Sequence, residues 1–467
     1  MRLIFIILFF YCSNILSSEE NQTKELDSFF NKKPAEQREI FINKVFLNLT
    51  KELDSFLNKK PAEQREIFIN KFRKIILNKN TSVEKSTESI TTQTDNIKTV
   101  ESLLIKSLES ISNGKLDQAI KTVDELIALA PNFKLAHLIR GDILTAYSMS
   151  IDNFGGSAIK INSIKVEEFK KEAQRRIKGY LASIKYNLQP KFNILPAQND
   201  KYLIYVDMDS SRLFVFENSK GKYSYLSDYY VSIGRNGYGK RFEGDKKTPF
   251  GTYFIQKKIQ EELTDFYGDG AYPLNYPNEF DRVNKFTGSG IWIHGTPKST
   301  YSRAPEASDG CIVLSNKDLV EIKNVLNTTG TPVILSNLSI NNLSLRKEED
   351  IKNDQKRLLS AIKSWKESWR NANYSEYINF YTNNAIYNNA NYKKWALIKK
   401  NVFKRSKNIQ ISLNNISIYE YPSNQDQLRI VLFDQDYKSN LIINKTKKKQ
   451  MWKTENGEWK IIYEGTQ

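Results

Sequence analysis

The sequence predicts a multidomain protein of α and β structure, with a helical N-terminal region, a mainly β central domain and an α+β C-terminal domain. Two polar segments, 79–97 and 338–356, divide the 467 residues as linkers would. A hydrophobic content of 40% over this length supports two or three cores, and 25 Tyr with 25 Phe supply the packing of β-rich domains. We therefore assign the chain from its N-terminus in segments.

Residues 1–18 have the pattern of a signal peptide. Arg2 precedes an apolar run from Leu3 to Tyr11, and a segment of small residues follows up to Ser18. The run is too short to span a membrane comfortably, so we expect export to the periplasm. Cys12 raises the alternative of a lipoprotein, although Tyr11 is too large for the position that usually precedes a lipidated cysteine.

Residues 19–78 contain a tandem repeat. The segment 24–44 recurs at 51–71 with one change, Leu57 in place of Phe30. Pro34 and Pro61 each stand where a helix can begin. A spacer or self-association helix and a dispensable duplication both fit this pattern.

Residues 98–190 are expected to form a small helical domain. The small residues and the single proline, Pro131, between Gly114 and Ala146 resemble a tetratricopeptide-like helix pair. Because a single repeat cannot bury its own apolar face, a compact domain is favoured over a peptide-binding array, which is the alternative.

The chemistry-bearing residues are His294 and Cys311. The chain has two His and two Cys, and one of each lies within residues 294–311. Since Cys12 falls in the signal peptide, the mature chain would hold a single thiol beside an imidazole, the minimum for a cysteine nucleophile with its base. The alternative is an ordinary buried Cys and a packing His. A separation of 17 residues fits two neighbouring strands joined by the loop 298–307.

Residues 201–335 resemble the L,D-transpeptidase catalytic domain, a β-rich cysteine fold that acts on peptidoglycan stem peptides, and we expect this domain to span 195–337. The resemblance rests on an ordered series of blocks: Tyr202–Asp207, Arg212–Phe216, Val231–Gly234, Thr248–Tyr253, His294-Gly295 and Ser308-x-Gly310-Cys311. Papain-like enzymes place Cys before His, and the caspase block is missing here, so those families do not fit.

The resemblance implies a role for each site residue. Cys311 would attack the peptide carbonyl, His294 would be its base, and the Gly295 carbonyl would orient the imidazole. The oxyanion would be held by backbone amides, those of Gly310, Cys311 and Asp309. Ser308 is expected to shape the turn and, with Arg303 and Trp292, to face the substrate.

Two positions depart from the family pattern. Many members have His before the Gly-Cys and Arg or Asn two residues after the Cys, where this chain has Asp309 and Val313. An acidic side chain beside a thiolate would raise the pKa of the thiol. A solvent-facing Asp309 without a catalytic role is the favoured interpretation.

Residues 357–467 resemble the nuclear transport factor 2-like fold, a cone of sheet against helices. A helix around Trp365 and Trp369 precedes strands at 409–419, 428–437 and 448–461. Such domains hold a ligand or mediate assembly. This segment contains no His and no Cys, so a catalytic role has little support. We expect this domain to be separable, so that a chain ending near Ser339 would remain folded.

The order of the domains resembles the helical-cell-shape L,D-carboxypeptidases of the Campylobacter and Helicobacter group, which implies trimming of tetrapeptide stems to tripeptides. A transpeptidase that forms 3-3 cross-links or attaches a protein to the wall, and a noncatalytic wall-binding scaffold, are the alternatives. The sequence offers no metal or cofactor motif and no nucleic-acid-binding motif. The net charge of +17 suits anionic wall polymers or reflects Lys-rich coding. The expected partners are peptidoglycan stem peptides, with self-association or a protein partner through either terminal region.

Overall fold

A computed structural model describes residues 99–148, 154, 155, 157, 163–185, 190–197, 199–388, 390–422 and 427–467. The expected signal peptide, tandem repeat and linker 79–97 lie outside these ranges. The chain divides into two compact units, Met1–Glu167 and Glu168–Gln467, which we describe separately. No helix in the described ranges has both the length and the apolar character needed to cross a bilayer.

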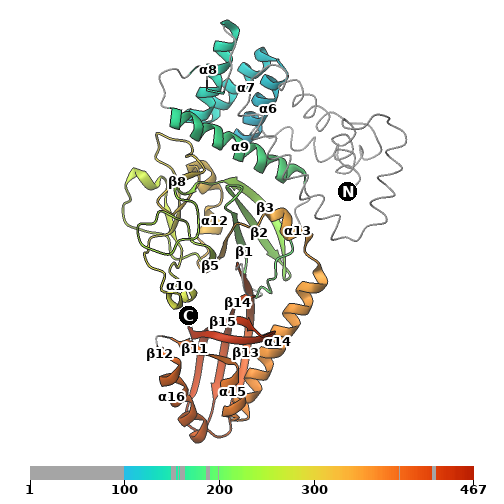
Figure 1. The fold of residues 1–467 in the computed structure, drawn as a ribbon, viewed down its shortest axis with the longest axis vertical. Coiled ribbons are helices and arrows are strands. Elements are labelled where there is room, and N and C mark those ends of the chain that lie inside the picture. Colours follow the sequence, from blue (N-terminus) through green and yellow to red (C-terminus); the bar gives the residue numbers. More distant parts are fainter. Residues whose placement is uncertain are drawn as a thin grey trace, which may run out of the picture. The chain divides into compact units, whose positions relative to one another are not determined.

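The described part of the first unit is helical. Helices α6 (Val100–Ser112), α7 (Leu116–Leu129) and α8 (Lys134–Ser148) follow one another, and α9 (Ser163–Lys185) begins in this unit (Figure 1). Thr99 and Ser102 form a capping box that starts α6. The pair expected over Gly114–Ala146 is α7 and α8. The boundary between the units falls within α9, so the helical region expected up to residue 190 is not one compact unit.

The second unit opens with a sheet of five strands in the order β3-β2-β1-β10-β5. Their bounds are β1 Tyr202–Asp207, β2 Arg212–Ser219, β3 Lys222–Tyr230, β5 Gly251–Phe254 and β10 Pro332–Ser336. The central strand β1 pairs in parallel with β10 and antiparallel with β2, and all six of its residues are buried. Burial on both faces explains why β1 reads as a continuous apolar run in the sequence.

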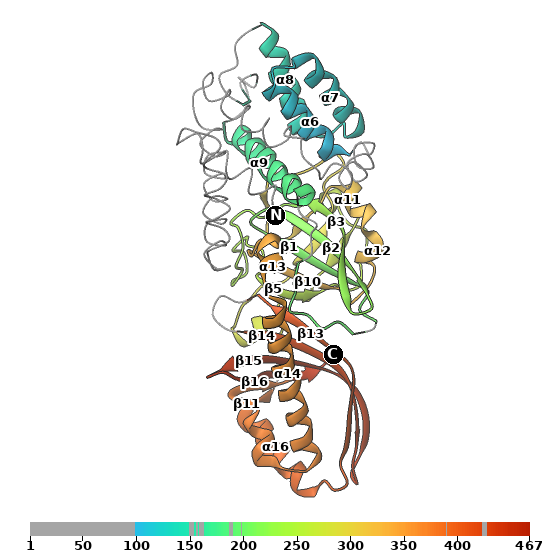
Figure 2. The same ribbon diagram turned by 90° about the vertical axis from the view of Figure 1, so that its right-hand side faces the viewer.

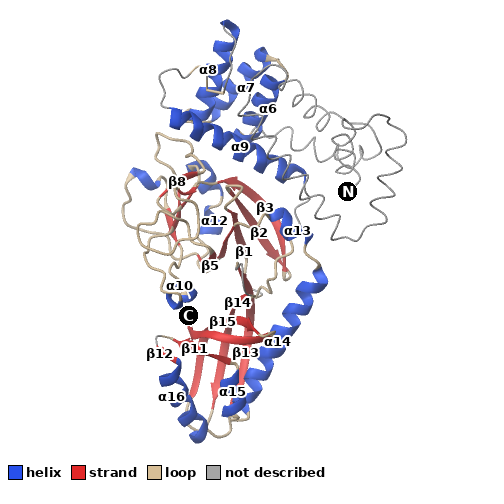
Figure 3. Ribbon diagram, viewed as in Figure 1, coloured by secondary structure: helices blue, strands red, loops and turns tan. Residues whose placement is uncertain are grey.

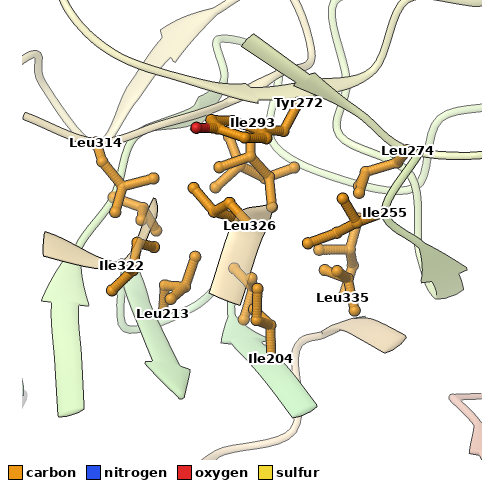
Figure 4. Close-up of a cluster of buried hydrophobic side chains, with 14 of the residues drawn as sticks. Ile204, Leu213, Ile255, Tyr272, Leu274, Ile293, Leu314, Ile322, Leu326 and Leu335 are labelled. Carbon is orange, nitrogen blue, oxygen red and sulfur yellow. The ribbon is translucent and has the colours of Figure 1, made fainter. Parts of the chain in front are cut away.

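Smaller sheets carry the expected site. Strands β6 (Ala271–Pro273), β7 (Trp292–His294) and β9 (Ile312–Val313) form one, and β4 (Ile233–Gly234) pairs with β8 (Glu306–Ser308) in another. Short helices accompany them: η1 Asp265–Tyr267, α10 Glu279–Val283, α11 Asn316–Glu321 and α12 Lys323–Leu326. Ile293 of β7 and Leu326 of α12 pack into one buried cluster with Ile204 and Leu335 of the large sheet (Figure 4). This core fixes β7 and β9 against the large sheet.

The C-terminal part is a six-stranded sheet packed against helices (Figures 2 and 3). The strand order is β12-β11-β16-β15-β14-β13, and the helices packed against this sheet are α14, α15 and α16, which follow α13 in the chain. Their bounds are α13 Ile340–Leu345, α14 Glu348–Arg370, α15 Tyr374–Asn379, β11 Tyr381–Tyr387, β12 Ala390–Asn391, α16 Tyr392–Arg405, β13 Gln410–Tyr421, β14 Leu428–Lys438, β15 Ile443–Glu455 and β16 Glu458–Thr466.

The prediction of a linker at 338–356 is wrong, because α13 and the first turns of α14 form there. In α14, Asp354, Leu358, Ile362, Trp365 and Trp369 are buried at the spacing of one helical face. The acidic residues Glu348, Glu349 and Asp350 fill its first turn, where they favour the helix dipole. The polar composition therefore belongs to the exposed face and start of a helix.

The catalytic and C-terminal parts share a hydrophobic core. One buried cluster joins Tyr205, Phe214 and Phe254 of the large sheet to Tyr419, Ile430 and other residues of β13 to β16. The Thr252 hydroxyl donates a hydrogen bond of 2.7 Å to the Glu420 carbonyl. Leu195 and Ile418 form an isolated antiparallel β-bridge. Removal of the C-terminal part would expose this cluster, so the structure argues against a separable domain.

Candidate active site

The side chains of His294 and Cys311 lie on the same face of the small sheet. Strands β7 and β9 are parallel, with Ile293 opposite Ile312 and His294 opposite Val313. Side chains alternate along a strand, so Cys311, two residues before Val313, points to the same side as His294. The intervening Ile293 and Ile312 are fully buried in the core on the other side. Core burial of these two isoleucines thus sets the direction of both functional side chains.

The imidazole of His294 is held by a backbone carbonyl. Its Nδ1 lies 2.7 Å from the Gly295 carbonyl oxygen. A carbonyl only accepts, so Nδ1 carries the proton and Nε2 is left as the basic nitrogen. The pKa of His294 is lowered to about 4, chiefly by burial and also by the charge of Arg303, while the bond to Gly295 opposes both. The ring is therefore neutral at physiological pH.

Two aromatic residues of η1 enclose the imidazole. The Tyr267 ring lies 5.1 Å from the His294 ring in an edge-on contact, and the Phe266 ring lies 6.0 Å away. The Tyr267 carbonyl also accepts a hydrogen bond of 3.0 Å from the Gly295 amide. This segment accounts for the burial that depresses the pKa of His294.

Asn316 supports the Gly295 segment and was not among the residues expected from the sequence. Its Nδ2 donates to the Thr296 carbonyl at 2.8 Å, and its Oδ1 accepts from the Asp269 amide at 3.1 Å. A Cβ added at Gly295 would lie 2.0 Å from the Asn316 Oδ1 and 3.2 Å from the Asp269 nitrogen, so the position requires glycine. The contact joins segments far apart in the sequence, and no local pattern announces it.

The Cys311 thiol is half-buried and protonated at rest. Its Sγ lies 3.4 Å from the Gly290 carbonyl oxygen, which it can donate to. Burial raises the pKa of Cys311 to about 11; the Trp292 amide and the Arg303 charge lower it, and Asp309 raises it. With the pKa of Cys311 raised and that of His294 lowered, both groups favour their neutral forms at physiological pH.

Ser308 and Gly310 shape the turn before Cys311. Ser308 is buried, and its hydroxyl donates to the Cys311 carbonyl at 2.6 Å and accepts from the Gly310 amide at 3.1 Å. Gly310 has φ +124°, and its carbonyl accepts from the Thr248 hydroxyl at 3.0 Å. The Gly310 amide is thus engaged by the Ser308 hydroxyl, and its expected role as an oxyanion donor stays a prediction. Ser308 closes the turn and does not face substrate.

The amides of Asp309 and Cys311 remain as candidate oxyanion donors. In the described part of the chain, neither amide has a hydrogen-bond acceptor. The Asp309 side chain is 65% exposed and pairs with Arg235 at 2.7 Å. Asp309 thus agrees with the solvent-facing interpretation for its carboxylate, while its backbone stays available to the site.

Arg303 and Trp292 lie against the aromatic residues of η1, and the Arg303 charge and the Trp292 amide act on the Cys311 thiol. The Arg303 guanidinium lies 4.3 Å from the centre of the Phe266 ring and donates to the Phe266 carbonyl at 3.1 Å. The Trp292 ring lies 5.0 Å from the Tyr267 ring. No group of three or more metal-binding side chains occurs among the described residues.

Comparison with known proteins assigns the two domains. The family described as the L,D-transpeptidase catalytic domain matches residues 201–335. Residues 201–335 are an L,D-transpeptidase catalytic domain. The Cds6 C-terminal NTF2-like domain family matches residues 357–465. The expected fold class is confirmed, namely a helical N-terminal region, a β-rich L,D-transpeptidase domain and an NTF2-like C-terminal domain.

Individual relatives match different shares of the chain. The Escherichia coli K12 protein named "Putative L,D-transpeptidase YafK" is 28% identical over 102 residues, which are 22% of this chain and 37% of that protein. A structure of the helical cell shape determining protein Pgp2 from Campylobacter jejuni superposes with a TM-score of 0.50 and 24% identity, covering 62% of this chain and 97% of the other. Bdellovibrio bacteriovorus Bd1075 gives a TM-score of 0.49 and 26% identity over 59% of this chain and 97% of that one.

Proposed function

We propose that this protein is an exported L,D-carboxypeptidase that trims peptidoglycan tetrapeptide stems to tripeptides through a thioester on Cys311. The carrying observation is the placement of His294 and Cys311 on one face of the small sheet, with the His294 Nδ1 bonded to the Gly295 carbonyl. This geometry supplies a base with a defined tautomer beside the thiol of the catalytic domain.

The reaction begins with a neutral pair. As the Cys311 sulfur attacks the carbonyl before the terminal D-alanine, a C–S bond forms and the His294 Nε2 takes the thiol proton. The Asp309 and Cys311 amides face the oxyanion. The C–N bond then breaks, and the imidazolium gives its proton to the departing amine. Water attacks the thioester as His294 takes a proton from it. The C–S bond then breaks, and the imidazolium gives that proton to the departing sulfur, which restores the thiol and the neutral imidazole.

Hydrolysis is proposed over transfer because of the domain order. The L,D-transpeptidase domain followed by an NTF2-like domain is a fold shared with a protein named for determining helical cell shape, which supports a role in wall trimming and cell shape. An amine could attack the same thioester, so transpeptidation is the competing outcome of the test.

Purified protein should be incubated with disaccharide–tetrapeptides, with and without an amine acceptor, and the products separated by chromatography. Tripeptide in both reactions supports the carboxypeptidase. Linked dimers would establish a transpeptidase instead, and intact substrate that binds the protein would leave only a wall-binding scaffold.

Replacement of the nucleophile and its base provides the matched variants. Cys311→Ala should abolish turnover, and its melting temperature should stay within a few degrees of that of the wild-type protein. His294→Ala should lower kcat by a factor on the order of 10³, because a thiol with a raised pKa needs the base to be ionised. The double variant should be no slower than Cys311→Ala, and residual activity in Cys311→Ala would contradict the mechanism.

A further inference from the structure

A cavity of about 890 Å³ lies beside the turn that carries Cys311, and the mechanism above does not use it. Its lining includes Lys240, Arg241, Phe242 and Lys247 from the loop 238–247, together with Phe286 and, from the C-terminal domain, Lys453. Its volume falls in the range of small-molecule sites.

The cavity adjoins the nucleophile. The Lys247 carbonyl oxygen lies only 2.8 Å from where a Cβ on Gly310 would be, so its backbone packs against the residue before Cys311. The next residue, Thr248, donates its hydroxyl to the Gly310 carbonyl. The charge of Lys240 also acts on the Cys311 thiol, which places this wall of the cavity within electrostatic range of the reacting atom.

The loop 238–247 is rigid because Asp245 ties it together from inside. The Asp245 carboxylate accepts hydrogen bonds from the amides of Arg241, Phe242 and Lys247 at 2.8 to 3.1 Å, and from the Lys240 ammonium at 2.9 Å. These bonds hold the pKa of Asp245 near 2 despite an opposing effect of burial. The loop is also attached to its neighbour, because the Glu243 amide donates to the Thr287 hydroxyl at 3.1 Å and the Thr287 amide donates to the Arg241 carbonyl at 2.9 Å.

The rigid loop displays apolar and cationic groups outward. Phe242 is 65% exposed, although a side chain of this size would normally be buried. Arg241 is exposed with its guanidinium 5.9 Å from the Phe286 ring centre, and Lys247 is half-exposed. Four cations line the cavity, namely Lys240, Arg241, Lys247 and Lys453. Lys240 and the single carboxylate, Asp245, pair with each other within the loop, so Arg241 and Lys247 carry the excess positive charge of this loop. The site is therefore charge-complementary to an anion with an apolar face.

We propose that this cavity binds the glycan-linked part of the stem-peptide substrate, with Arg241 and Lys247 on the carboxylates of the stem and Phe242 against its sugar. The proposal rests on the proposed function for the identity of the substrate. A disaccharide–tetrapeptide carries more carboxylates than amines and ends in a sugar whose C–H face is apolar, which matches the lining. A preformed loop loses little conformational entropy on binding, so the exposure of Phe242 serves recognition.

The test uses full-length protein and two soluble substrates, a disaccharide–tetrapeptide and the sugar-free tetrapeptide. Phe242→Ala should raise KM for the disaccharide substrate by about tenfold and leave KM for the free tetrapeptide within about twofold. The Arg241→Gln, Lys247→Gln double variant should raise KM for both substrates by at least about tenfold, less so at high salt, with kcat within about twofold. Leu226→Ala and Lys323→Gln are matched controls, because both residues are exposed and line no part of this cavity.

Binding of the disaccharide–tetrapeptide to Cys311→Ala, measured by titration calorimetry, tests the site independently of the reaction. Loss of disaccharide–tetrapeptide affinity on adding Phe242→Ala to this background supports the site even if the wild-type protein proves unable to hydrolyse the substrate, an outcome that would overturn only the proposed function. A KM and an affinity that stay within about twofold of wild type in the loop variants would overturn the site. A fall in kcat with unchanged KM would overturn it too, because these residues would then act on the chemistry or the fold.

Discussion

At the scale of single residues, two opposing charges act on the Cys311 thiol. The Arg303 guanidinium favours the thiolate and lowers the pKa of Cys311, whereas the Asp309 carboxylate raises it. Arg303 is anchored on Phe266, but Asp309 is exposed and already paired with Arg235. Solvent therefore screens the effect of Asp309 more than that of Arg303.

Replacing each charge should move thiol reactivity in opposite directions. In a Cys12→Ser background, Arg303→Gln should raise the pKa of Cys311 and slow its alkylation by iodoacetamide at a fixed alkaline pH. Asp309→Asn should lower the pKa and speed alkylation by a smaller factor that shrinks with added salt. Rate–pH profiles measure both effects, and Arg282→Gln, at an exposed ion pair of α10, is the control. Slower alkylation in Asp309→Asn would refute the assigned sign.

At the scale of elements, helix α9 holds the loop that carries Arg303. Glu172 and Arg176 of α9 form a buried ion pair at 3.0 Å, and the Glu172 carboxylate accepts from the Ser302 hydroxyl at 2.6 Å. The Arg176 guanidinium lies 3.9 Å from the centre of the Tyr230 ring, and the Tyr230 hydroxyl donates to the Arg303 carbonyl at 2.9 Å. Helix α9, which lies outside the catalytic domain, thus holds Ser302 directly and Arg303 through Tyr230.

Loss of the α9 contact should loosen this loop. Ser302→Ala removes a hydrogen bond to a buried carboxylate, which is worth roughly 1.5–3 kcal/mol in stability. We expect a lower melting temperature, a kcat reduced by about tenfold through misplaced Arg303, and faster proteolysis within 298–307. Ser299→Ala in the same loop is the matched control, because Ser299 is exposed. Identical behaviour of the two variants would mean that α9 does not position the loop.

At the scale of the whole second unit, the shared core predicts that the catalytic and NTF2-like parts unfold together. Five of the six tryptophans, all except Trp292, lie in the C-terminal part, and Cys311 is the thiol of the catalytic part. Tryptophan fluorescence and thiol exposure therefore report the two parts separately. In the Cys12→Ser background we expect coincident thermal transitions by both probes.

Variants of the shared core test the same point. Ile430→Ala, which removes a side chain of β14 from this core, should lower both transitions by equal amounts, with a cost of about 2–5 kcal/mol. A chain ending at Ser339 should bind a hydrophobic dye and aggregate, since it would expose Tyr205 and Phe254. Two separated transitions, or a soluble truncated chain that still acylates Cys311, would restore the modular interpretation.

The sequence by itself determined the chemistry and the order of the domains. His294, Gly295 and Cys311 could be assigned because the rare residue types and their glycine neighbours form local motifs, and the family resemblance set the fold class. The strands at 202–207, 410–421 and 428–438 were predictable because their apolar patterns are local as well. These features depend on residues close together in the chain.

Only the tertiary structure decided which groups are available and what supports them. Whether the Gly310 amide can reach an oxyanion depends on the Ser308 hydroxyl, which the fold turns toward it. Asn316, the α9 contact to Ser302 and the core around Tyr419 and Ile430 join segments that are distant in sequence. Residues 338–356 looked like a linker because composition records their solvent-facing side and not the face that packing buries. Contacts of this kind exist only after the chain has folded, and no periodicity or motif encodes them.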